Sequence, residues 1–201
     1  MHLNHLFATA ALAAVLAACG QPATPTTTAT ETVTATTPVD SNAITSEGWG
    51  ALRVGMTRAD VTAAVGATAT PGAVGGPDPQ ACDLFHPANA PTGLLVMIQQ
   101  DRLTSITLRN NADLKTDRGF GIGSTAAEIK AAYGASAMSE PHKYVAGAEY
   151  ITVWTSGAPA SAGAFVQDAS ARGIRYETDA QGRVTAVHAG GPSIQNVEGC
   201  S

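Results

Sequence analysis

The sequence predicts an α+β fold of two tandem similar units, each a short helix followed by a small antiparallel sheet. An internal repeat, helix-capping signals in both copies and alternating apolar runs after each copy support this prediction. Residues 54–67 read VGMTRADVTAAVGA and residues 122–135 read IGSTAAEIKAAYGA. Seven of the 14 aligned positions are identical, which is far beyond chance even in an Ala-rich chain.

Each copy of the repeat predicts one short helix. Thr125 and Glu128 have the spacing of a capping box, in which the hydroxyl and the carboxylate each satisfy a backbone N–H of the first turn. Thr57 and Asp60 form the same pattern with a shorter acid. Because helices this short are not stable alone, each must pack on the strands that follow it.

Short apolar runs after each copy predict the strands. A turn sequence at 179–182 predicts a hairpin between the last two, and a second hairpin is expected across 99–102. The expected strands are 83–86, 94–98, 103–108, 150–154, 173–178 and 183–189. The first unit is therefore assigned to residues 47–115 and the second to residues 116–201.

The first 18 residues resemble a lipoprotein signal peptide. Residues 6–18 are apolar but too short to span a bilayer as a helix. They end in Leu16-Ala17-Ala18-Cys19, which resembles the bacterial lipobox and implies that Cys19 is lipidated. Because Met1–His5 holds no Lys or Arg, an ordinary signal peptide with an incidental cysteine, or a misassigned start, stays open. By the same resemblance, Gly20 favours an outer-membrane lipid anchor on the periplasmic side.

Residues 19–46 are expected to form a Thr/Pro-rich flexible linker. Ten of the 26 residues from Gln21 to Ser46 are Thr, so the segment has too little apolar surface to offset its ordering entropy. The chain from Glu47 onward holds 14 acidic and 11 basic residues. A surface with that charge argues against a nucleic-acid partner, and membrane attachment would be through the lipid rather than through a basic patch.

Cysteine usage predicts one disulfide. With Cys19 used for the lipid, Cys82 and Cys200 remain, and two cysteines in an exported protein most simply pair. Free thiols are the alternative. The absence of a CxxC motif argues against a redox-active pair.

No sequence motif points to catalysis, a cofactor or a metal. The GxSxG, HExxH and Walker patterns are absent, and the glycines at 119–123 are interpreted as a structural turn. His86, His142 and His188 lack the spacing of a metal ribbon or helix, so a site would require them to converge in space with Asp83. We therefore expect no enzyme activity, no cofactor and no metal.

Four residues are candidates for contact with a partner: His142, Tyr144, Tyr150 and Trp154. His142 lies in an expected loop, where functional residues are common, although a solvated side chain is the default. Tyr150 and Trp154 lie an even number of positions apart and therefore share one sheet face. Tyr and Trp are frequent interface anchors, and the alternative is that they fill the core.

The pattern GMTRADVTAAVG followed by antiparallel strands resembles two known families. These are the small lipoproteins of the outer-membrane β-barrel assembly machinery and the tandem-repeat β-lactamase inhibitor proteins. The segment 141–144 (PHKY) and the ending VEGCS are similar to envelope lipoproteins with the same double unit. By the inhibitor resemblance, Tyr150 and Trp154 belong to an aromatic sheet face that grips a target.

These observations predict a non-enzymatic lipoprotein that acts as a protein-interaction module in envelope assembly or maintenance. The expected partner is an envelope protein. The alternative is an inhibitor or ligand-binding protein that acts on an envelope enzyme or a cell-wall component.

Overall fold

The computed structural model describes residues 42–68, 78–111, 113–157 and 163–200. The predicted signal peptide, Cys19 and the linker up to residue 41 lie outside the described residues. All described residues belong to one compact unit, Pro38–Ser201. No described helix is long and apolar enough to cross a membrane.

Seven strands form one antiparallel sheet in the order β4-β5-β6-β10-β9-β8-β7. The last strand of the first half, β6, pairs with the last strand of the chain, β10, so both hairpins join a single sheet. The strands are β4 Cys82–Phe85, β5 Leu94–Gln99, β6 Arg102–Arg109, β7 Met138–Pro141, β8 Glu149–Ser156, β9 Arg172–Thr178 and β10 Val184–Gly190.

A second, three-stranded sheet precedes the first helix. It consists of β1 Ile44–Thr45, β2 Gly48–Trp49 and β3 Leu52–Arg53. Ile44 is 1% exposed, and its amide donates to the Lys115 carbonyl oxygen at 2.9 Å. Residues 42–46 therefore belong to the fold, whereas composition assigned them to the linker. One buried isoleucine at the end of a Thr-rich segment is too weak a signal for composition to detect.

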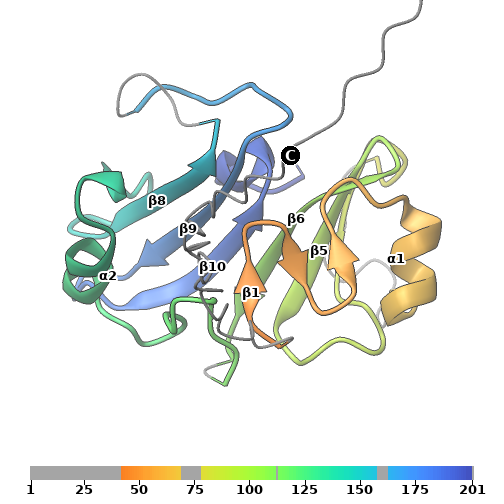
Figure 1. Cartoon of the computed structure of the whole chain (residues 1–201), viewed down its shortest axis with the longest axis horizontal. Coiled ribbons are helices and arrows are strands. Elements are labelled where there is room, and N and C mark those ends of the chain that lie inside the picture. Colours follow the sequence, from red (N-terminus) through yellow and green to blue (C-terminus); the bar gives the residue numbers. More distant parts are fainter. Residues whose placement is uncertain (1–41, 69–77, 112, 158–162, 201) are drawn as a thin grey trace, which may run out of the picture. The chain divides into compact units, whose positions relative to one another are not determined.

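The two helices are α1 Arg58–Val65 and α2 Ala126–Tyr133, and each begins with a complete capping box. Thr57 Oγ1 accepts from the Asp60 amide at 3.1 Å, and Thr125 Oγ1 accepts from the Glu128 amide at 3.2 Å. The helices lie at opposite ends of the seven-stranded sheet, with β1 between them (Figure 1).

Both helix N-termini are attached to a hairpin of the sheet. Before α1, the Gly55 amide donates to the Leu103 carbonyl oxygen at 2.8 Å. Before α2, the Gly123 amide donates to the Val184 carbonyl oxygen at 2.9 Å. The glycines at 119–123 thus belong to a structural turn whose Gly123 amide is already bonded within the fold.

Strand alternation gives the sheet two different faces. The helix face is apolar and packs against both helices and the small sheet, with Leu103, Ile106, Ile151 and Tyr176 among its buried residues. The opposite face, here called the polar face, is contacted by η2 Pro192–Gln195 of the C-terminal segment. In pairing register it carries Ser105, Thr107, Arg109, Tyr150, Thr152, Trp154, Arg175, Glu177 and His188.

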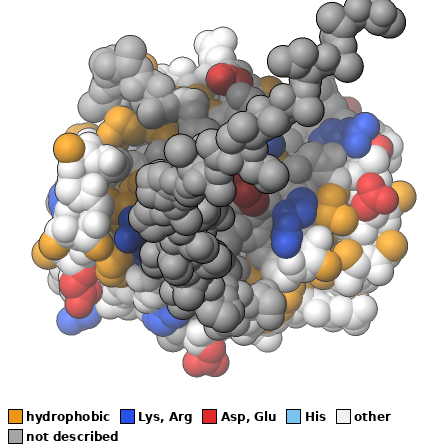
Figure 2. Space-filling view, viewed as in Figure 1, with side chains coloured by type: hydrophobic (Ala, Val, Ile, Leu, Met, Phe, Trp, Pro, Cys, Tyr) orange, Lys and Arg blue, Asp and Glu red, His pale blue; other side chains and the backbone are white. Residues whose placement is uncertain are grey.

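The structure confirms the α+β class and finds all six expected strands, with ends shifted by one or two residues. The hairpin across 99–102 closes through Gln100 and Asp101, both with positive φ, as a type I′ turn requires. The sequence did not predict β7 or the small sheet, because strands of two to four residues are too short to show an alternating pattern of apolar and polar side chains. Figure 2 shows charges of both signs scattered over the described surface in that view, consistent with the composition.

Candidate functional site

A cluster of hydrogen-bonded side chains lies around one carboxylate in the middle of the polar face. Glu177 on β9 lies within 3.2 Å of an Arg109 nitrogen and 3.1 Å of His142 Nε2. His188 Nε2 is 3.4 Å from the same carboxylate. The side chains of Glu177, His142 and His188 are 18%, 6% and 15% exposed, so the cluster is largely shielded from water.

The hydrogen bonds assign the tautomers of both histidines. His142 Nδ1 accepts from the amides of Tyr144 and Val145 at 3.0 and 3.1 Å, so its proton is on Nε2, which donates to Glu177. His188 Nδ1 lies 3.0 Å from Thr107 Oγ1, which donates to it, leaving His188 Nε2 to donate to the carboxylate. Glu177 thus accepts hydrogen bonds from two imidazole N–H groups and one guanidinium.

Electrostatics stabilise this arrangement of charges. The hydrogen bond from His188, with that from His142 and the Arg109 charge, lowers the pKa of Glu177 to about 2 despite burial. Burial lowers the pKa of His188 because desolvation disfavours the imidazolium. The cluster at neutral pH is therefore an anionic carboxylate surrounded by donors, which is a poor general base.

A stack of three side chains lies beside the carboxylate. The Arg175 guanidinium lies 3.9 Å from the centre of the Tyr150 ring, and the His142 ring stacks on Tyr150 with centroids 4.5 Å apart. Arg175 is 4% exposed and 3.8 Å from Glu140. Desolvation lowers the pKa of this guanidinium, although it stays a cation. Tyr150 therefore packs against a buried cation, the Arg175 guanidinium.

The loop that follows β7 is clasped to the C-terminal segment. Lys143 Nζ is 2.7 Å from Glu198 Oε1, and the Tyr144 hydroxyl donates to the same carboxylate. Lys143 also lies 5.1 Å from the centre of the Tyr144 ring. Together with the His142 contacts, these bonds fix the loop and leave the Tyr144 ring 61% exposed.

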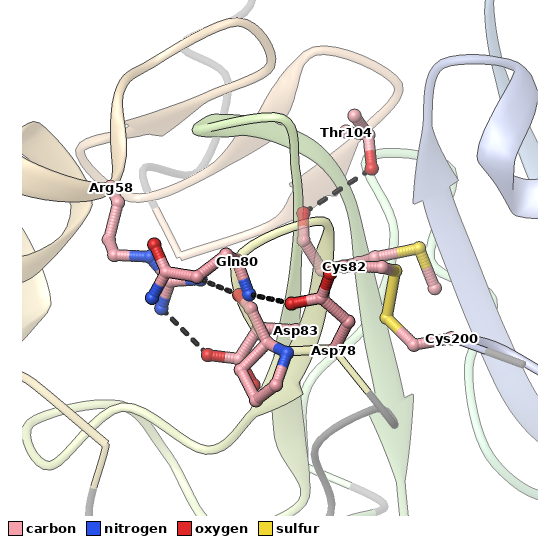
Figure 3. The surroundings of a disulfide bond; sticks show 9 residues. Arg58, Asp78, Gln80, Cys82, Asp83, Thr104 and Cys200 are labelled. Atoms are coloured by element: carbon pink, nitrogen blue, oxygen red, sulfur yellow. Dashed lines mark hydrogen bonds and ion pairs between the residues drawn. A yellow bond between two sulfur atoms is a disulfide. The ribbon is translucent and has the colours of Figure 1, made fainter.

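The expected disulfide joins the C-terminal end of the described chain to the edge strand β4. Cys82 and Cys200 are bonded, with Cα atoms 5.5 Å apart and a sequence separation of 118. Figure 3 shows this bond at the start of β4, next to the Arg58–Asp83 ion pair of 2.7 Å. We call residues 196–200 the C-terminal strap.

The strap is held at both ends and forms a wall of two cavities. At its beginning, the Gln195 side chain bonds both backbone groups of Val166, at 2.9 and 3.0 Å. At its end stands the disulfide. One cavity, of about 370 Å³, lies beside the disulfide and Lys143; the other, of about 280 Å³, lies over the polar face.

Thr107, His188 and Glu177 follow the order hydroxyl, imidazole, carboxylate that is known from nucleophilic triads. Such chemistry also needs donors for an oxyanion. Since β6 is paired with β5 on one side and β10 on the other, its amides lie in the sheet ladders. The donors that would stabilise an oxyanion next to Thr107 are therefore missing from β6, and the geometry favours a structural network.

The four candidate contact residues occupy different environments. Tyr144 is exposed, whereas the His142 side chain lies beneath the loop against Glu177. Tyr150 and Trp154 do share the polar face, but they are only 4% and 9% exposed. Trp154 packs with residues of the 163–171 segment and η2, whereas Tyr150 packs against His142 and Arg175. Neither ring can reach a partner unless the groups that cover it move.

The three histidines do not converge on one point. His142 and His188 meet at Glu177, whereas His86 Nδ1 lies 2.8 Å from the Leu94 carbonyl oxygen and Asp83 pairs with Arg58. Among the described residues, no group of three or more His, Cys, Asp or Glu side chains could hold a metal ion.

Sequence reasoning missed Glu177, Arg175, Arg109 and Thr107. They come from two strands, β6 and β9, and no spacing along the chain relates the residues of one strand to those of the other. Alternation along β9 places Arg175 and Glu177 on the same face, and this pair could have been predicted from the sequence. The register that brings Arg109 and His188 beside them depends on the β6–β10 pairing, and local sequence does not specify that pairing.

Comparisons of this chain with models of known protein families, with curated proteins and with solved structures found no match.

Proposed function

We propose that the protein is an outer-membrane-anchored periplasmic lipoprotein, and that its folded domain is a non-enzymatic protein-interaction module in envelope assembly or maintenance. One observation carries the proposal: the exposed large hydrophobic side chains of the described residues lie on the segments that cover the polar face. These residues, with their exposed fractions, are Tyr144 (61%), Val145 (41%), Phe165 (59%) and Val197 (37%).

Three of these side chains belong to one clasped structure. Tyr144 and Val145 lie on the loop that Glu198 holds, and Val197 precedes Glu198 in the strap. An aromatic ring that is already fixed loses little conformational entropy when a partner covers it. Tyrosine is also enriched among interface residues that dominate binding energy. A preorganised, exposed tyrosine beside two valines therefore fits a protein partner.

We infer further that residues 47–115 and 116–201 are the two tandem units that the repeat predicts. Equivalent contacts support this inference. The Arg102 guanidinium donates to the Gly55 carbonyl oxygen, and the Arg183 guanidinium donates to the Gly123 carbonyl oxygen, each at 3.2 Å. The equivalent capping boxes and helix attachments point the same way. Duplication would build one wide sheet from two small ones.

Lipid attachment at Cys19 would tether this domain. If residues 20–41 form the coil that their composition predicts, its root-mean-square span would be roughly 23–28 Å for ~22 residues, enough for the domain to search near the membrane. The resemblance of the GMTRADVTAAVG segment to lipoproteins of the β-barrel assembly machinery agrees with an envelope partner.

In-cell cross-linking of the tagged protein, followed by mass spectrometry, tests the proposal. We expect one envelope protein or complex to be enriched over a Cys19→Ser control, which should also leave the membrane fraction. Tyr144→Ala should reduce that enrichment, because it removes the exposed ring. Thr62→Ala, an exposed change on α1, should leave it unchanged. Equal capture by the Tyr144→Ala and Thr62→Ala proteins would contradict the proposed surface.

A second candidate function, an inhibitor or ligand-binding protein acting on an envelope enzyme or cell-wall component, rests on a different observation. The two cavities beside the strap, of about 370 and 280 Å³, are near the size range of small-molecule sites.

A further inference from the structure

The cavity over the polar face has walls of two chemical kinds. Its floor comes from β5, β6 and β10, its edge from β4, and its cover from η2 and the strap. At about 280 Å³ it has room for about nine water molecules at ~30 Å³ each, or for a ligand with a similar number of non-hydrogen atoms. It is lined by Leu84, Leu95, Met97, Ser105, Thr107, Arg109, His188, Ser193, Asn196, Val197, Glu198 and Gly199.

A buried hydroxyl in this lining has no hydrogen-bond partner. Ser193 is 9% exposed, and its Oγ is buried with no hydrogen-bond partner among the described residues. A buried hydroxyl without a partner is costly, so a group that accepts a hydrogen bond from it would be stabilised there. By contrast, Thr107 and His188 already satisfy each other at 3.0 Å. Ser193 is therefore a hydroxyl in the lining that has no partner among the described residues and can donate to a ligand.

A cation in the same lining has unused donors. Arg109 makes one side-chain hydrogen bond within the described residues, from one terminal nitrogen to Glu177 at 3.2 Å. Its side chain is 45% exposed, and a guanidinium has five N–H donors. The other charged residue in the lining, Glu198, is already bonded to Lys143 and Tyr144. The available charge is thus positive, which favours a carboxylate that can accept two parallel bonds.

The remaining wall is aliphatic. Leu84, Leu95, Met97 and Val197 line it, and the strap approaches the sheet there, since a Cβ on Gly199 would lie 3.5 Å from Leu84 Cδ2. Apolar surface with a few placed polar groups is the usual composition of a small-ligand site.

We propose that this cavity binds a small aliphatic carboxylate, whose oxygens accept from Arg109 and Ser193 while its chain lies against Leu84, Leu95 and Met97. A free short-chain or medium-chain fatty acid and the apolar C-terminal residue of a peptide share this chemistry. The inference gives a ligand class to the second candidate function and does not depend on the surface around Tyr144.

Two acids and their neutral counterparts test the proposal. The full chain carrying Cys19→Ser, which has no attached lipid, is titrated in detergent-free buffer with octanoate and with N-acetylleucine, and amide chemical shifts are followed by NMR. We expect saturable shifts at residues 196–199. Octan-1-ol and N-acetylleucinamide should bind about tenfold or more weakly, because they lack the carboxylate. The tighter of the two acids identifies the source, lipid or peptide.

Variants locate the binding. Arg109→Met should weaken binding of the two acids about tenfold or more. Arg118→Met, at a residue outside this lining, should leave their binding unchanged.

Since Arg109→Met also removes a bond to Glu177, Leu95→Trp provides a second variant that fills the cavity and leaves that cluster intact. It should abolish binding. Retained binding by Leu95→Trp, equal binding of acid and alcohol, or no shifts in the strap at millimolar acid would each overturn the proposal. None of these results bears on cross-linking through Tyr144.

Discussion

The two faces of the seven-stranded sheet are built from the same strands but are stabilised by different forces. The helix face buries Leu103, Ile106 and Ile129 completely, so removal of apolar surface from water dominates there. The polar face buries Glu177, His142 and His188 in a hydrogen-bonded group, with Arg175 stacked on Tyr150 beside it, under a covalently fastened strap. Alternation along each strand thus yields one face that is insensitive to pH and redox state and one that depends on both.

The largest effect is expected from the disulfide. The Cys82→Ser/Cys200→Ser variant should lose up to about 4–5 kcal/mol of unfolding free energy, because the bond closes a loop of 118 residues in the unfolded chain. Urea unfolding monitored by circular dichroism measures this loss. Adding dithiothreitol should lower the stability of the wild type and leave the variant unchanged. A wild type that is insensitive to full reduction would show that the strap contributes little.

The second largest effect is expected from pH, which should change the stabilisation contributed by the polar face and not that contributed by the helix face. The pKa of Glu177 is about 2 in the folded chain, against an ordinary value of 4.5. A lowered carboxyl pKa stabilises the fold above pH 4.5 and loses that contribution as pH falls toward 2, here about 3 kcal/mol. Since the pKa of His188 is also lowered, protonation of the unfolded chain below its ordinary value of 6.5 acts in the same direction.

Glu177→Gln should therefore destabilise the protein at pH 7 by about 2–3 kcal/mol and have a much smaller effect near pH 2–3. Leu103→Ala on the helix face is the matched control. It should cost about 2–5 kcal/mol at both pH values, because a cavity among apolar side chains does not titrate. Urea unfolding at the two pH values distinguishes the faces, and parallel behaviour of the two variants would remove the proposed division.

The difference between the two faces also explains which parts of the structure the sequence could predict. Apolar alternation and the capping pattern reveal the helix face, because those signals lie within a few residues of one another. The Cys82–Cys200 bond follows from simple counting. The Glu177 cluster combines β6, β9, β10 and a loop, so its prediction requires the pairing of β6 with β10 across 81 residues from Thr107 to His188. Tyr150 and Trp154 share a face as expected. The contacts that bury them come from His142 over Tyr150 and from the 163–171 segment and η2 over Trp154, and no pattern within β8 indicates these contacts.

The smallest predicted effect tests whether the two helices are equivalent parts of the helix face. Thr57→Ala and Thr125→Ala each remove a hydroxyl that caps an N–H and bonds the acid three residues later, at 2.7 and 2.8 Å. Each should cost about 1 kcal/mol, measured by urea unfolding. Asp60 and Glu128 have pKa values below their ordinary ones because of these threonines, so both losses should shrink as the acids protonate. Thr62→Ala, within α1 but away from the cap, controls for helix propensity.

If the repeated segments 54–67 and 122–135 have equivalent structural roles, Thr57→Ala and Thr125→Ala should lose closely similar amounts of unfolding free energy. A loss confined to one helix would mean that the shared sequence is retained for different reasons at the two ends of the sheet.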